Sequence, residues 1–204
     1  FYPWCIAVEA LLLIGLFRLH VLVPFVSLAP VLFLGYGLMN PDIELRLLPP
    51  ALQSGWFVPH VMAYFVAYAA LLVSCVLAVL AILDPGGFRE EGSSAGAPLR
   101  GRASRARGAH LAAVFGVAVL TLGLVLGAVW GKSAWGDYWS WDPKENWALV
   151  TWLSYVVYLH LARMPGWQGR RSAWLLVVSF GAVMFTWLGM HLLPTAEGSL
   201  HVYQ

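Results

Sequence analysis

Charged residues are scarce in this chain: they make up 11% of its 204 residues, against about a quarter in a soluble domain. Hydrophobic residues make up 60%. A composition this poor in charge excludes an ordinary soluble globule and indicates several membrane-spanning segments. The predicted fold class is an all-α polytopic membrane protein with about six transmembrane helices and a tryptophan-rich loop or short helix at its outer face.

Cysteine is also scarce, and neither cysteine belongs to a redox or haem-attachment motif. Cys5 and Cys75 each lie inside an apolar run, without a CxxC or CxxCH pair. Cysteines in that setting are usually small buried apolar residues. The pattern excludes a disulfide oxidoreductase and a c-type cytochrome. The chain begins with Phe1 rather than Met, and we expect it to be a fragment or a processed chain whose earlier part is missing.

Six apolar runs are each close to the ~20 residues that cross a bilayer core. Two of them fall in an N-terminal region, residues 1–39, and four in a core region, residues 40–204. The first two runs are separated only by Arg18 and His20. The predicted spans are 3–19, 21–39, 57–83, 109–130, 146–162 and 173–192.

Basic residues are concentrated in alternate loops, which predicts the orientation of the chain. Nine of the twelve Lys and Arg residues are Arg18, Arg89, Arg100, Arg102, Arg105, Arg107, Arg163, Arg170 and Arg171. By the positive-inside rule these loops face the cytoplasm, so their arginines need no nucleic acid to explain them. Residues 84–108 then form a flexible cytoplasmic linker. Residues 40–56, the stretch WGDYWSWDPKENW (135–147) and the C-terminal tail meet at the outer end of the bundle.

The tryptophan-rich stretch contains a helix start. Asp142 fits an N-cap, Pro143 the first helical position, and Glu145 the third position of a capping box. Before this start, aromatic rings crowd into a few residues. One interpretation is an interfacial aromatic belt. The other is a platform for a large flat ligand. The rings of this platform are Trp135, Tyr138, Trp139 and Trp141, with Trp147 just inside the helix.

Three histidines lie at two different depths of the predicted bundle. His60, at the outer start of a span, and His201, in the outer tail, lie on the side of the tryptophan-rich stretch. Two neutral imidazoles that approach from opposite sides can hold a six-coordinate haem iron. His160 lies about 25 Å into its span at 1.5 Å per residue, toward the cytoplasmic side. There it is either a functional intramembrane residue or a histidine that interacts with the last helix carbonyls.

The remaining titratable residues in or near the spans have less specific interpretations. His20 and His110 are most simply residues of the cytoplasmic interface, and His191 ends the last span on the outer side. Glu9 is a carboxylate inside an apparent span. Its role stays open.

Three motifs in order resemble the CcsA (ResC) family of system II cytochrome c biogenesis. The run WGDYWSWDPKENW resembles the WWD motif of haem-handling proteins in its CcsA form. LPPALQSGWFVPHV resembles the family's loop before a helix-opening histidine, and GSLHVY resembles its closing segment. The resemblance covers residues 45–203. Asn146 departs from the family, because a small hydroxyl residue is commoner there, and so does the tail wording LHVYQ.

The resemblance implies a haem-handling subunit of a cytochrome c synthase in the bacterial inner membrane or the thylakoid equivalent. It implies that His60 and His201 are external axial ligands of haem b, and that His160 is an intramembrane ligand. The platform aromatics would hold the haem for attachment to the CxxCH motif of an apocytochrome c. CcsB (ResB) would be the partner subunit. We identify no independent catalytic residue, and whether the chain alone counts as an enzyme stays open. The alternatives are a haem-independent transporter and a b-type electron-transfer cytochrome.

Overall fold

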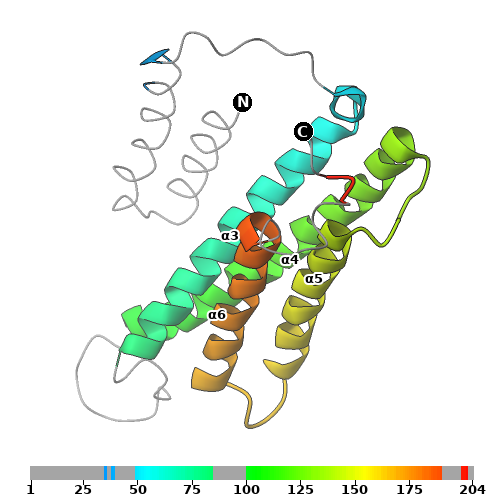
Figure 1. Cartoon of the computed structure of the whole chain (residues 1–204). Helices are drawn as coiled ribbons and strands as arrows, with labels where there is room; N and C mark the ends of the chain where they lie inside the picture. The colour runs from blue at the N-terminus through cyan, green and yellow to red at the C-terminus, as the bar shows by residue number, and fades with distance from the viewer. Residues whose placement is uncertain (1–34, 36–37, 40–48, 85–99, 190–198, 202–204) are drawn as a thin grey trace, which may run out of the picture.

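Four long helices run side by side as a bundle (Figure 1). The computed structural model describes residues 35, 38–39, 49–84, 100–189 and 199–201. Every regular element between residues 49 and 201 of this part is helical, which confirms the all-α prediction. The elements are η2 (Pro50–Gln53), α3 (Phe57–Leu83), α4 (Arg100–Trp135), α5 (Pro143–Leu161), α6 (Arg170–Met184) and η3 (Phe185–Gly189), a π-helical turn that continues α6.

Three helical segments are long and apolar enough to cross a bilayer. They are Phe57–Leu83, Arg105–Trp135 and Arg170–Gly189. These segments confirm a polytopic membrane protein. Helix α5 is not among them, because its sequence PKENWALVTWLSYVVYLHL mixes charged and polar residues with its aromatics. The predicted spans 3–19 and 21–39 lie outside the described residues apart from positions 35, 38 and 39, so a count of six spans stays a prediction.

The surface of the bundle supports the same conclusion. Large apolar side chains on all four helices are exposed along their outward faces. Lipid tails solvate such side chains, whereas water would not. They include Leu72, Val76, Leu80, Leu122, Val125, Val157 and Val178.

Helices α3 and α4 pack closely because small residues line their contact. Ala67 of α3 and Ala112 and Ala113 of α4 are completely buried. A Cβ added at Gly116 of α4 would lie 2.7 Å from the Leu71 side chain, so a larger residue fits there only if Leu71 moves. Small residues that allow close approach are the usual means of helix association in membranes. Leu71, Leu120, Tyr155, Leu176 and Val183 fill the rest of the core.

The predicted linker at residues 84–108 ends earlier than expected. Helix α4 already begins at Arg100, so residues 100–108 are helical and that part of the prediction is wrong. The sequence there, RGRASRARG, is rich in Arg and Ala, which are strong helix formers. Arg105 also donates a 3.3 Å hydrogen bond to Asp84 at the end of α3, which ties the two helices together. Residues 85–99 lie outside the described part.

The close contact at Gly116 predicts a stability effect. We expect Gly116→Ala to lower the free energy of unfolding by about 1–3 kcal/mol, because Leu71 must move to accept the new methyl group. Gly181→Ala is the matched control, since a Cβ there meets nothing within 4 Å. Thermal unfolding in detergent would measure both. Equal stability of the two variants would contradict the packing argument.

Candidate functional site

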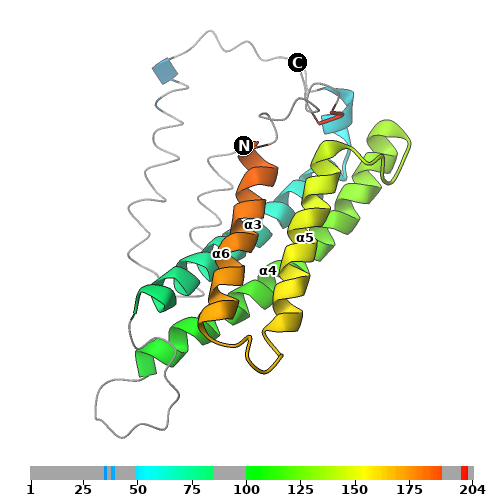
Figure 2. The ribbon, with the colours of Figure 1, turned by 60° about the horizontal axis from the view of Figure 1, so that its bottom comes forward.

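One end of the bundle contains a cavity of about 400 Å³. The start of α3, the end of α4, the start of α5, turn η3 and residues 199–201 meet there (Figure 2). This confirms that the segment before α3, the tryptophan-rich stretch and the tail converge, as far as the described residues reach. The volume is within the ~300–1,000 Å³ typical of small-molecule sites. The lining includes Phe57, His60, Tyr64, Phe65, Trp130, Trp135, Tyr138, Trp139, Lys144, Glu145, Thr186 and His201.

The predicted helix start at the cavity is confirmed in detail. The Asp142 carboxylate accepts a 2.8 Å hydrogen bond from the Lys144 N–H, and Pro143 is the first residue of α5. The Glu145 carboxylate accepts in return from the Asp142 N–H at 3.1 Å and from the Ser140 N–H at 2.8 Å. The charges of the tryptophan-rich stretch therefore fix the turn between α4 and α5.

The same Asp142 carboxylate anchors the C-terminal tail. It accepts hydrogen bonds from the Ser199 hydroxyl at 3.0 Å, the Leu200 N–H at 2.7 Å and the His201 Nδ1 at 3.1 Å. Burial raises the pKa of Asp142, but the hydrogen bonds from the Lys144 and Leu200 N–H groups outweigh burial and the pKa lies below its ordinary value. The residue is 5% exposed and ionised, and it joins two segments that are far apart in sequence.

His201 is a neutral imidazole with one defined tautomer. Burial lowers the pKa of His201 to about 4, although the neighbouring Asp142 carboxylate opposes this shift. An ionised carboxylate can only accept, so the proton is on Nδ1 and the lone pair is on Nε2. The ring packs edge-on against Trp135, with centroids 4.8 Å apart. A neutral imidazole with a free Nε2 is the form that binds metal.

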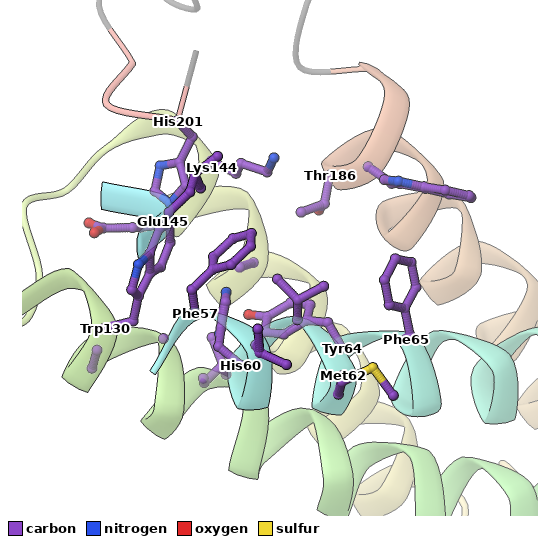
Figure 3. A pocket seen from close by; sticks show the side chains of 18 of the residues that line it. Phe57, His60, Met62, Tyr64, Phe65, Trp130, Lys144, Glu145, Thr186 and His201 are labelled. Atoms are coloured by element: carbon purple, nitrogen blue, oxygen red, sulfur yellow. The ribbon is translucent and has the colours of Figure 1, made fainter. Parts of the chain in front are cut away.

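His60 reaches the cavity from the first turn of α3 in the same tautomer. Its Nδ1 donates to the Gly123 carbonyl of α4 at 2.9 Å, and a carbonyl can only accept. In a neutral ring with this hydrogen bond, the lone pair is on Nε2. A Cβ added at Gly127 would lie 2.6 Å from the His60 Cε1, so the ring fits only because Gly127 has no side chain. Figure 3 shows His60 on α3 and His201 on the tail segment, with Trp130 near both rings.

Trp130 joins the two histidines, and sequence reasoning did not include it among the site residues. Its ring stacks on His60 with centroids 5.4 Å apart and packs edge-on against His201 at 5.7 Å. Its Nε1 donates to the Ala51 carbonyl of η2 at 2.8 Å. The sequence showed only that Trp130 ends a predicted span just before the tryptophan-rich stretch. That position is equally typical of a tryptophan at the membrane interface.

The predicted aromatics separate into two groups. Trp135, Tyr138 and Trp139 line the cavity, whereas Trp141 and Trp147 do not. Trp141 is 69% exposed and has a φ of 59°, in the left-handed region that favours glycine. The Asn146 side chain donates to its carbonyl at 2.8 Å, which gives the departure at Asn146 a structural role. Trp147 packs against Phe185 of η3, with centroids 4.2 Å apart.

His160 lies in the last turn of α5, at the opposite end from the cavity. It is exposed, and it continues an outward-facing apolar stripe of Val150, Leu153 and Val157. The structure does not bring it to His60 and His201. His110, predicted at the cytoplasmic interface, is half-buried in the bundle with its Nδ1 3.0 Å from the Tyr158 hydroxyl. Glu9, His20 and His191 lie outside the described residues.

The sequence matches the family described as cytochrome c assembly protein over residues 1–196. The chain belongs to this family. It is 38% identical over 178 residues to the cytochrome c biogenesis protein CcsA of Synechococcus sp. strain CC9605, which covers 76% of this chain and 58% of that protein.

Other CcsA proteins give the same result, and they confirm the resemblance seen in the motifs. The protein of Synechococcus elongatus (strain ATCC 33912) is 34% identical over 219 residues, covering 87% of this chain and 66% of its own length. That of Chlamydomonas reinhardtii is 35% identical over 212 residues, covering 100% and 58%. This chain thus spans about three fifths of the length of these curated family members.

The position of His60 against Gly127 predicts a local effect. We expect Gly127→Ala to push the ring away from the Gly123 carbonyl, because the added Cβ would overlap the imidazole. The measurement is the ¹⁵N NMR signal of the His60 ring, which distinguishes protonated from unprotonated nitrogens. Gly116→Ala, a similarly crowded change in the same helix but against Leu71, is the matched control. An unchanged His60 signal in Gly127→Ala would show that glycine is not needed there.

Proposed function

We propose that the cavity holds haem b as transported cargo, with the iron bound between His60 and His201. The observation that carries the proposal is the tautomer of both rings. Each Nδ1–H donates to an acceptor, the Gly123 carbonyl or the Asp142 carboxylate, and each Nε2 keeps its lone pair. Histidines that bind metal almost always donate their other ring N–H to a carbonyl or carboxylate in this way.

The cavity wall suits a porphyrin. Trp130 and Trp135 stand against the histidine rings, and Phe57, Tyr64 and Phe65 continue the apolar lining along α3. Aromatic side chains offer large flat contact area at a small cost in rotamer entropy. Lys144 supplies a positive charge at the lining, where it can attract the propionate carboxylates. Trp130 contacts both histidines, so a porphyrin that enters between them must displace or stack upon it.

The distribution of charge supports an outer-face position for the cavity. Arg105 and Arg107 lie near the start of α4, Arg163 follows α5, and Arg170 and Arg171 begin α6. All five are at the end of the bundle opposite the cavity. With the basic end in the cytoplasm, the cavity opens at the outer face of a bacterial inner membrane or a thylakoid membrane.

Within cytochrome c biogenesis, the protein then presents haem to the CxxCH motif of an apocytochrome c, in a complex with CcsB. Thioether formation adds the S–H of each apocytochrome cysteine across a vinyl double bond of haem. No group leaves, and no covalent bond forms between haem and this chain. The contribution of this chain is to hold the vinyl edge in place, since orientation lowers the barrier of such an addition. His160, exposed at the cytoplasmic end, is the ligand for haem that enters with the help of CcsB.

The cavity ligands give the first test of this function. We expect the double variant His60→Ala/His201→Ala, purified with CcsB, to lose most of its haem and the bis-imidazole absorption spectrum, because both nitrogen ligands are gone. His110→Ala is the control, because this histidine lies at the other end of the bundle and contacts Tyr158. Unchanged haem content and spectrum in the double variant would overturn the assignment and favour a haem-independent transporter.

His160 gives the second test. We expect His160→Ala to reduce haem loading from the cytoplasmic side while haem supplied from the outer side still binds with a bis-imidazole spectrum, because His160 is remote from the cavity. Covalent labelling of a co-expressed apocytochrome c, scored by haem staining, reports the whole pathway. Normal loading from the cytoplasmic side in His160→Ala would contradict the entry role.

A further inference from the structure

We infer that Asp142 is the positioning residue of the His201 ligand and makes His201 the stronger electron donor of the two axial histidines. The inference rests on the proposed haem site. From the sequence pattern, Asp142 is only the residue that caps the start of α5. In the structure its carboxylate also binds the C-terminal tail, because residues 199–201 are held at the cavity by hydrogen bonds to it.

The two carboxylate oxygens of Asp142 together accept four hydrogen bonds. Oδ1 accepts from the Lys144 N–H, the Ser199 hydroxyl and the His201 Nδ1, and Oδ2 accepts from the Leu200 N–H. The Ser199 hydroxyl oxygen also lies 3.2 Å from the His201 N–H, which closes a small network around the ligand. The orientation of the His201 ring is therefore set by the same group that sets the first turn of α5.

The partners of the two histidines differ in charge. His60 donates its Nδ1–H to a neutral carbonyl of α4, and His201 donates to an ionised carboxylate that is 5% exposed. A buried carboxylate draws the Nδ1 proton toward itself and raises the basicity of Nε2 more than a carbonyl does. The ligand pair is thus unequal, with the stronger donor in the tail and the weaker one on α3.

An amide cannot replace this carboxylate. Asparagine caps a helix as well as aspartate does, so Asp142→Asn keeps the start of α5. Its amide has one oxygen, however, and the four donors approach both ends of the side chain. With the oxygen toward Lys144 and His201, the NH₂ group faces the Leu200 N–H. With the amide reversed, the NH₂ group faces the other three donors. Either way His201 loses the negative charge behind its ring.

The experiment compares Asp142→Asn with Asp137→Asn in the complex with CcsB. Asp137 is an exposed carboxylate of the same loop and lies outside the cavity lining, so it controls for the loss of one charge. In Asp142→Asn we expect haem affinity to fall about 10- to 100-fold. We also expect the midpoint potential of the bound haem to rise, because a weaker donor stabilises ferric iron less. Asp137→Asn should match the unmodified protein in both measurements.

Ser199→Ala separates ligand strength from tail docking. It removes the two hydrogen bonds of the Ser199 hydroxyl, to Asp142 and from the His201 backbone N–H, but keeps the carboxylate against the His201 ring. We expect its haem to keep the unmodified potential, whatever its affinity. A purely structural role for Asp142 predicts instead that Asp142→Asn and Ser199→Ala lower affinity together and leave the potential unchanged, and that result would overturn the inference.

A measurement without haem tests the geometry on the unmodified protein. The ¹⁵N NMR signals of the His201 ring should show a protonated Nδ1 and an unprotonated Nε2. The opposite tautomer would overturn the inference even if every variant failed to fold. Absence of haem from the unmodified complex would instead overturn the proposed function, so the two failures are distinguishable.

Discussion

The close contact between α3 and α4 is the constraint on which the site depends. A ring at position 60 can lie against α4 only because Gly127 has no side chain, and it finds an acceptor only because the Gly123 carbonyl faces it. Farther down the same contact, Gly116 gives Leu71 its place. One interface of small residues thus both holds the bundle together and directs a polar side chain into an apolar environment, where an unsatisfied imidazole N–H would be costly.

A second set of constraints acts at the end of the bundle. The loop before α5 carries bulky rings and ionised groups into a region where side chains from several helices meet, and three of the charged side chains there have structural partners. Glu145 closes the turn, Asp142 holds the tail, and Lys132 donates to the Gly136 carbonyl and lies 5.5 Å from the centre of the Tyr138 ring. The aromatic rings can then face the cavity because the polar groups beneath them are satisfied.

Much of this arrangement was predictable from the sequence. Apolar runs indicated α3, α4 and α6, and the DPKE pattern predicted the start of α5, because both signals are local. The start of α4 was missed, since a Gly- and Arg-containing segment is typical of a linker as well as of a helix. Trp130 was missed because its partners, His60 and His201, are distant in sequence. Trp139 lines the cavity and Trp141 does not, because the backbone of Trp141 is in the left-handed region. The hydrophobic pattern of the sequence does not predict such a backbone conformation.

The tail contact has a consequence for the order in which the molecule is made. His60 enters the membrane with the first described span, but its counterpart His201 follows the last one. Of the two proposed ligands of the cavity, a nascent chain carries only His60 during synthesis, and His201 arrives only after every described helix has been made. Completion of the iron site would therefore report that the bundle is fully assembled, and a truncated chain would hold haem by one side only.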